Sequence, residues 1–272
     1  MSHGPPLNDV ELEVLYLWES QRPHSLRQYD QIPMIGRDLM SSVKYVAPLI
    51  ANHDVAFMGD HDGVSVLLGL LAVRGQLIPP RRMTLLDFDE RLLLAVDDLS
   101  RREGFSGILS TQLYNAFDAV PTHLTGSFDT FYTNPPYGAS NVGESVRLFV
   151  TRGSELAPRA GSQGFIVLPY DQEREWTRKA MMTTVAFLGQ HGWDQKSLVP
   201  EIHGYHLDDD PSLTSSLLTV KRTVELAEPM PWANRSLSES EIPHFYGRSE
   251  RPPYPRYIRA DGRPTAFDRA AS

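Results

Sequence analysis

Cysteine is absent from the 272-residue chain, which excludes disulfides, thiolate metal sites and cysteine nucleophiles. No apolar run approaches the ~20 residues that a membrane-spanning helix requires. The first residues also lack the basic and apolar regions of a signal peptide. These absences favour a cytoplasmic protein that has no membrane partner.

An excess of basic residues is also missing, because the formal net charge is -8 at pH 7. Proteins that bind double-stranded nucleic acid usually carry a basic footprint. An acidic balance instead suits a cationic substrate. Hydrophobic residues make up 41% of the chain, which is enough for one sizeable α/β domain with appendages.

Short apolar segments alternate with helical segments from residue 54 onward. This alternation predicts a doubly wound, Rossmann-like α/β sheet of seven strands, mostly parallel. The expected strands are 55–58, 83–86, 107–113, 128–134, 164–168, about 193–202 and 216–221, and the expected helices between them are about 64–74, 90–103, 144–156 and 174–191.

Both ends of the chain differ from this central pattern. Two helices, near residues 8–20 and 36–50, are predicted before the sheet, and Asn8 with Glu11 forms a capping-box pattern for the first. After residue 224 the chain is rich in proline and arginine, which predicts an irregular tail that wraps over the core. Basic residues among tyrosines could alternatively grip a single strand of nucleic acid. We therefore divide the chain into a helical cover (1–52), a catalytic domain (53–223) and a tail (224–272).

The most informative motif is Asn134-Pro135-Pro136-Tyr137, which directly follows the predicted strand 128–134. Proline has no N–H for a strand ladder, so the chain must leave the sheet there. Ligands of open α/β sheets bind beyond the carboxyl ends of the strands. Asn134, Pro135 and Tyr137 are therefore candidate catalytic residues that hold an amine, although the motif could simply be a capped turn.

The turn after the first strand, Gly59 to Gly63, carries two carboxylates, Asp60 and Asp62. A glycine-rich turn that binds an anion offers bare N–H groups and a helix N-terminus. Two carboxylates would repel an anion and attract a cation. We expect Gly59, Asp60, Asp62 and Gly63 to contact a ligand that ends in an ammonium group, with Asp60 also catalytic. The alternative is that Asp62 or Ser65 only caps the following helix.

Polar residues follow the next two strands as well. Asp87, at the end of the second strand, is the better candidate for binding ribose hydroxyls, and Asp89 has a competing role as a helix cap. Asn115 or Asp118, after the third strand, could recognise the exocyclic amine of an adenine. All of these residue types also occur as ordinary turn formers.

A second acidic segment is the predicted loop 203–210, in which Asp208, Asp209 and Asp210 could hold the ammonium groups of a polyamine. We assign His206, Asp208 and Asp209 to substrate binding, together with Tyr170 and Asp171 after the fifth strand. Such an acidic run is more often a solvated loop. His203 and His206 flank no second metal-type cluster, so we predict no metal.

These residues resemble those of a known family. The Gly-Asp-x-Asp turn at 59–62, the Asp-Phe-Asp-Glu-Arg-Leu run at 87–92 and the Pro-Pro-Tyr turn at 135–137 are similar to the C-terminal catalytic domain of the branched-chain polyamine synthases. The resemblance covers about residues 20–222 and implies a class I methyltransferase-like fold. It implies that Asp60 and Asp62 face the aminopropyl end of decarboxylated S-adenosylmethionine, that Asp87 holds its ribose, and that the proline turn borders the acceptor amine.

Asn134 departs from the family pattern, which usually has Asp at this position, and most of the family's N-terminal domain is missing. Asp can take a proton, whereas Asn can only orient the amine through its carbonyl. Asn-Pro-Pro-Tyr resembles the signature turn of methyltransferases that act on adenine or on glutamine in proteins.

Three hypotheses follow. The first is an aminopropyltransferase acting on a polyamine, favoured by the acidic turns. The second is an S-adenosylmethionine-dependent N-methyltransferase acting on adenine in nucleic acid or on a protein amide, favoured by Asn134 and the tail. The third is a non-catalytic binding subunit with the same fold. Nucleic acid is a partner only under the second hypothesis, and a homodimer is one option under any of them.

Overall fold

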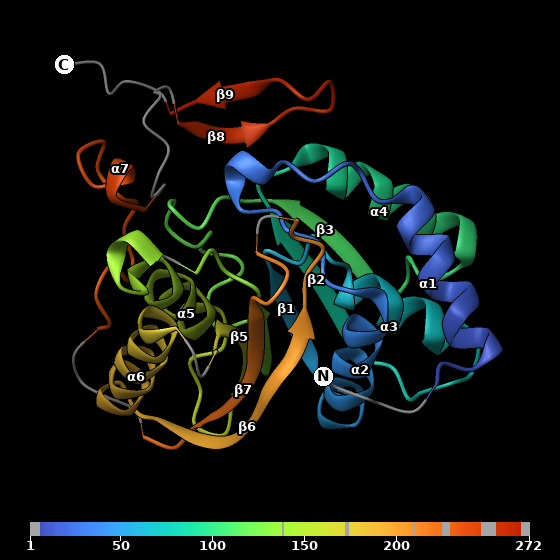
Figure 1. Ribbon diagram of the computed structural model, residues 1–272, viewed down its shortest axis with the longest axis horizontal. Coiled ribbons are helices and arrows are strands. Elements are labelled where there is room, and N and C mark those ends of the chain that lie inside the picture. Colours follow the sequence, from blue (N-terminus) through green and yellow to red (C-terminus); the bar gives the residue numbers. More distant parts are fainter. Residues whose placement is uncertain are drawn as a thin grey trace.

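The computed structural model describes residues 6–137, 139–171, 174–208, 210–224, 229–245 and 254–267. Its centre is a seven-stranded sheet with the strand order β3-β2-β1-β4-β5-β7-β6 (Figure 1). The strands are β1 (Asp54–Met58), β2 (Arg82–Asp87), β3 (Leu109–Leu113), β4 (Thr130–Thr133), β5 (Gln163–Pro169), β6 (Trp193–Gly204) and β7 (Thr214–Arg222). Strands β1 to β5 pair in parallel, and β7 is antiparallel to both of its neighbours. The predicted Rossmann-like sheet is therefore confirmed.

Helices cover both faces of the sheet (Figure 1). They are α1 (Asp9–Gln21), α2 (Gly36–Val46), α3 (Val64–Val73), α4 (Glu90–Glu103), α5 (Glu144–Leu156) and α6 (Glu175–Gln190). One hydrophobic cluster joins α1 to α4 with one face of the sheet, and a second joins α5 and α6 with the other face. Strand β4 is buried along its whole length, including the threonines at both of its ends, as is typical of a central strand of a parallel sheet that is covered on both faces. No helix within the described ranges is long and apolar enough to cross a membrane.

The N-terminal helices form where their sequence patterns predict them. The Asn8 side chain accepts the N–H of Glu11 at 2.9 Å, and the Glu11 carboxylate accepts the N–H of Asn8 at 3.0 Å. This is the predicted capping box. Val14 and Trp18 on α1 are completely buried in the cluster that also contains β1 and α3. The helical cover therefore shares a core with the sheet that it covers.

The C-terminal part is more regular than its composition predicts. A short helix, α7 (Ile242–Phe245), packs on Phe117 and Leu148, and an antiparallel pair follows, β8 (Pro255–Ile258) with β9 (Pro264–Ala266). We call this pair the C-terminal hairpin. Proline and arginine content gave no signal for it, because its strands are short and are stabilised by contacts with distant segments. The rest of the described tail is irregular and packs on the core, as predicted, whereas α7 and the hairpin were not predicted.

Candidate active site

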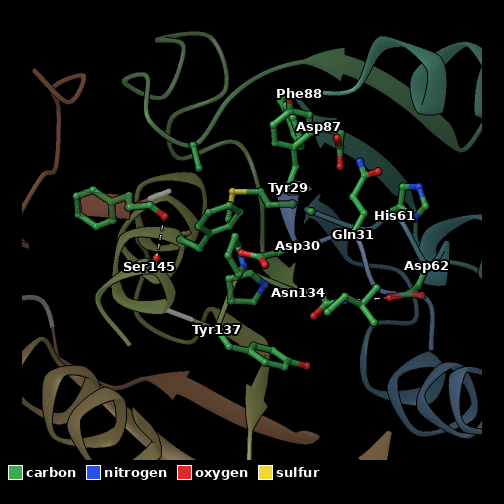
Figure 2. A pocket seen from close by; sticks show the side chains of 18 of the residues that line it. Tyr29, Asp30, Gln31, His61, Asp62, Asp87, Phe88, Asn134, Tyr137 and Ser145 are labelled. Carbon is green, nitrogen blue, oxygen red and sulfur yellow. Dashed lines mark hydrogen bonds between the residues drawn. The ribbon is translucent and has the colours of Figure 1, made fainter. Parts of the chain in front are cut away.

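A cavity of about 520 Å³ lies beyond the carboxyl ends of β1, β2 and β4. Ligand sites of small molecules commonly have volumes of about 300–1,000 Å³. The short loop 27–32, which includes the single helical turn Arg27–Tyr29, forms the wall that faces the strand ends (Figure 2). The position agrees with the general rule for ligands of open α/β sheets.

The first turn brings β1 close to β4. Gly59 has a φ of +66°, and a Cβ added to it would lie 2.9 Å from the carbonyl oxygen of Asn134. A side chain at this position would therefore push the two strand ends apart. Gly59 lines the cavity.

Asp60 is turned away from the cavity, contrary to its expected ligand contact. Its carboxylate accepts the N–H groups of Gly63, Val64 and Ser65 at 3.2, 2.8 and 2.7 Å. These N–H groups begin α3 and have no partner inside the helix, so a carboxylate satisfies them well. Asp60 therefore stabilises the N-terminus of α3. Gly63 is absent from the cavity wall as well, and instead lets the Trp18 ring approach closely.

Asp62 is the carboxylate of this turn that reaches the cavity. One of its oxygens accepts the N–H of Met34 at 2.8 Å, and the other accepts the side-chain amide of Asn134 at 3.0 Å. The guanidinium of Arg22 lies 3.6 Å away. These contacts lower the pKa of Asp62, but the effect of burial is larger and raises it to about 6. An additional cation in the cavity would therefore stabilise its ionised form.

The bond to Asp62 determines the orientation of the Asn134 amide. A carboxylate accepts hydrogen bonds, so the Asn134 nitrogen must face Asp62 and its carbonyl oxygen remains available as an acceptor. Pro135 and Pro136 continue the cavity wall next to it. Asn134 therefore presents a fixed acceptor at the tip of β4, as an amine-holding residue requires (Figure 2).

Tyr137 completes the motif and also lines the cavity. Its hydroxyl bonds to the hydroxyl of Tyr205, and Tyr205 in turn bonds to Ser215 at 2.6 Å. His203 contacts the same Ser215 hydroxyl at 2.9 Å. Burial holds the pKa of Tyr137 well above its usual value, so its phenol stays neutral. The network anchors the Tyr137 ring from β6 and β7.

Asp87 lines the cavity at the end of β2. It accepts the N–H of Asp89 at 2.9 Å, and burial raises its pKa to about 8. Asp89 does not reach the cavity. It caps α4 by accepting the N–H of Arg91 at 3.1 Å and forms an ion pair with the guanidinium of the same residue at 2.6 Å. The capping role predicted for Asp89 is therefore confirmed.

Asn115 lies on the cavity wall, but both ends of its amide already have partners. Its oxygen accepts the N–H of Phe117 at 2.9 Å, and its nitrogen donates to the carbonyl of Arg256 at 2.8 Å. Asp118 is bound by the guanidinium of Arg256 at 3.0 Å. The side chains expected to recognise an adenine amine instead hold the C-terminal hairpin.

The remaining predicted substrate residues lie away from the cavity wall. His203 belongs to β6 and is fully buried, so the expected loop begins later than predicted. His206 and Asp208 are exposed to solvent, and Asp171 pairs with Arg174. Tyr170 accepts a hydrogen bond from Thr214 through its backbone. Asp209 lies outside the described residues.

Several residues that line the cavity were not predicted from the sequence. Gln31 and Tyr29 come from the loop before α2, and His61 sits between the two aspartates of the first turn. Gln31 donates to Asp89 at 3.1 Å, and Tyr29 packs edge-on against Phe88 with ring centroids 6.0 Å apart. A loop without hydrophobic periodicity has no local signal for such contacts.

The strand order, with an antiparallel seventh strand and a polar site at the strand ends, defines a class I methyltransferase-like protein. A candidate RNA methyltransferase from Pyrococcus horikoshii shares this fold with a TM-score of 0.57 at 13% identity, over 79% of this chain and 98% of that one. More specifically, residues 11–196 match the branched-chain polyamine synthase A C-terminal domain. The chain belongs to this family.

Two known proteins are similar to the chain. It is 28% identical over 146 residues to N(4)-bis(aminopropyl)spermidine synthase of Thermococcus kodakarensis, and the match covers 53% of this chain and 38% of the relative. The chain thus spans well under half the length of that relative. A C9 mutein of the branched-chain polyamine synthase of Thermus thermophilus, solved with N4-aminopropylspermidine and 5'-methylthioadenosine, has the same fold with a TM-score of 0.70 at 19% identity. That likeness covers 85% of this chain and 68% of the other.

Proposed function

We propose that this protein transfers an aminopropyl group from decarboxylated S-adenosylmethionine to an amine nitrogen of a polyamine. The observation that carries the proposal is the pairing of Asp62 with Asn134 at the cavity wall, at a distance of 3.0 Å. It puts a carboxylate that can attract an ammonium group beside a neutral acceptor that can hold an amine. Family membership supports the same reaction, as do the N4-aminopropylspermidine and 5'-methylthioadenosine bound to the Thermus thermophilus protein.

In the proposed reaction, the acceptor nitrogen attacks the aminopropyl carbon next to the sulfonium. A new C–N bond forms as the C–S bond breaks, and the sulfur keeps the electron pair as the neutral thioether 5'-methylthioadenosine. The new ammonium group then loses a proton to solvent. The protein contributes mainly positioning and removal of water around the reacting amine.

The proposed roles follow the cavity wall. Asp62 would hold the ammonium end of the donor, and Asp87 would accept hydrogen bonds from its ribose hydroxyls. The Asn134 carbonyl would accept a hydrogen bond from the acceptor amine, with Tyr137 beside it. Asp60 has no ligand contact in this proposal, because three backbone N–H groups already occupy its carboxylate.

N-methyl transfer from S-adenosylmethionine is the second candidate. The observation in its favour is the Asn-Pro-Pro-Tyr geometry itself, in which the carbonyl oxygen of Asn134 is an available acceptor beside Tyr137. S-adenosylmethionine carries a carboxylate next to its ammonium group. Asp62 would attract the ammonium group but repel the carboxylate at neutral pH, and the nearby Arg22, 3.6 Å from Asp62, offsets only part of that repulsion. The buried carboxylate therefore favours the decarboxylated donor.

The deciding experiment incubates the full chain with decarboxylated S-adenosylmethionine and spermidine, and in parallel with S-adenosylmethionine and an adenine-containing oligonucleotide. Mass spectrometry should find 5'-methylthioadenosine and a polyamine heavier by one aminopropyl group in the first reaction. Methylated nucleic acid from the second reaction, with no new polyamine from the first, would overturn the proposal. Omission of the protein controls for spontaneous transfer.

A further inference from the structure

The C-terminal hairpin lies beside the ends of β2 and β3, far along the chain from both (Figure 1). It falls beyond the residues that match the family, which end at 196. None of its described residues belongs to the cavity wall, yet it contacts residues that do. Its position therefore needs an explanation other than direct contact with a ligand.

The hairpin binds the loop after β3 through side chains and backbone. Asn115 donates to the backbone carbonyl of Arg256 at 2.8 Å. The Arg256 guanidinium binds the Asp118 carboxylate at 3.0 Å, and the hydroxyl of Tyr257 donates to the same carboxylate at 3.3 Å. Asp118 sits only partly in solvent, which strengthens a charge-assisted hydrogen bond.

The hairpin also binds the turn after β2. The N–H of Ile258 donates to the carbonyl of Phe88 at 2.9 Å, and Ile258 forms a parallel bridge with Asp89. The N–H of Ala260 donates to the Glu90 carboxylate at 2.8 Å. Ile258 is almost completely buried. One short hairpin thus connects two separate loops at the same end of the cavity.

These two loops supply one end of the cavity wall, through Asp87 and Phe88 on one side and Asn115 and Ala116 on the other. In a nucleotide-binding sheet the ends of the second and third strands are where the ribose and the base lie. Holding two loops in a fixed relation removes part of the entropy cost of binding a ligand between them.

We propose that the C-terminal hairpin is a positioning element for the nucleoside part of the donor, and that Arg256 is its principal side-chain anchor. This inference rests on the proposed function for the identity of the donor. It concerns the affinity for the nucleoside, which can be measured without any transfer reaction. The hairpin fixes the spacing of the two loops, and the acceptor end near Tyr137 is outside its reach.

The test measures the affinity of the full chain for 5'-methylthioadenosine by calorimetry in Arg256→Ala, Arg256→Lys and Arg263→Ala variants. Arg263 is the matched control, because it lies on the same hairpin, has 85% of its side chain exposed and pairs with Asp261 nearby. We expect Arg256→Ala to lower the affinity for 5'-methylthioadenosine about fivefold. Arg256→Lys should restore much of that affinity, and Arg263→Ala should leave it unchanged. Asp118→Asn should weaken binding like Arg256→Ala, and melting temperatures report whether each variant is folded.

Steady-state kinetics add a readout that general destabilisation would not produce. The KM for the donor should rise in Arg256→Ala while the KM for the polyamine stays constant. Equal nucleoside affinity in wild type, Arg256→Ala and Asp118→Asn would overturn the hairpin inference and leave the proposed function standing. If the variants bind the nucleoside more weakly than the wild type, but the wild type transfers no aminopropyl group, the hairpin inference would be supported and the proposed function overturned. A wild-type chain that binds no nucleoside would overturn both.

Discussion

At the scale of single residues, two aspartates that are two positions apart have different tasks. Asp60 satisfies the start of α3 with both of its oxygens, whereas Asp62 reaches the cavity and orients Asn134. The Gly-Asp-x-Asp sequence does not separate them, because both side chains leave a tight turn whose backbone path is unknown beforehand. Asp62 is consequently the residue on which the charge argument for the donor depends.

Asp62→Asn should lower the affinity for decarboxylated S-adenosylmethionine by about 10- to 100-fold, the range for a lost hydrogen bond to a charged group. Binding of 5'-methylthioadenosine, which lacks the ammonium group, should change little. The wild-type affinity for the donor should also rise as the pH increases through about 6, the raised pKa of Asp62, because only the ionised carboxylate attracts the cation. Calorimetry between pH 5 and 8 tests both statements.

Asp208→Asn is the control for this experiment, since it removes an equal charge from an exposed position away from the cavity wall. Equal losses in the two variants would contradict a specific role for Asp62 and would indicate a long-range effect of net charge.

At the scale of elements, the first turn depends on a helix that precedes the sheet. The Trp18 indole on α1 donates to the backbone carbonyl of Asp62 at 2.5 Å. A Cβ on Gly63, whose φ is +90°, would lie 2.1 Å from the same indole nitrogen. Helix α1 thus presses directly on the turn that carries Asp62, and the N-terminal cover supports the site as well as the core.

Asp60→Ala should destabilise the protein by about 1–2 kcal/mol, the usual loss when a side chain that satisfies helix N-terminal N–H groups is removed. Asp60→Asn should cost less, because its amide oxygen still accepts one of those N–H groups. Urea unfolding measures the difference, with Asp98→Ala on the exposed face of α4 as the control. If the variants instead lost donor affinity at unchanged stability, Asp60 would have a role in ligand binding and not in stabilising the start of α3.

At the scale of the whole molecule, the cavity concentrates buried acidic groups in one place. Burial raises the pKa of Asp87 to about 8, so above its ordinary value near 4 the folded state holds a proton that the unfolded chain has released. Such a group lowers the free energy of unfolding as the pH rises through that interval. Buried His61 and His203 act in the opposite direction, but only below their ordinary pKa of 6.5.

The free energy of unfolding should therefore fall between pH 6.5 and pH 8, by at most about 1.4 kcal/mol per pH unit for the Asp87 proton. Asp87→Asn, which cannot ionise, should show a smaller decline. Urea titrations of both proteins at several pH values provide the measurement. An identical decline in the two proteins would mean that Asp87 is ionised in the folded state.

Much of the architecture was predictable because it depends on local signals. The apolar run before Asn134, the capping box at Asn8 and the cap at Asp89 each correspond to a pattern within a few residues. The C-terminal hairpin was not predictable in this way. Its order comes from contacts with Asn115, Asp118 and Phe88, which lie well over one hundred positions away in the chain.

The sequence by itself determined the sheet, the positions of its strand ends and the polar character of the site. Hydrophobic periodicity and turn residues are local signals, each contained within a few neighbouring positions. Only the tertiary structure decided which polar residues face the cavity. Asp62 and Asn134 meet because β1 and β4 are neighbours in the sheet, whereas Asp60, Asp89 and Asp171 are bound by closer partners. Side-chain direction depends on the competing hydrogen-bond donors around each residue, and those donors come from segments that only folding brings together.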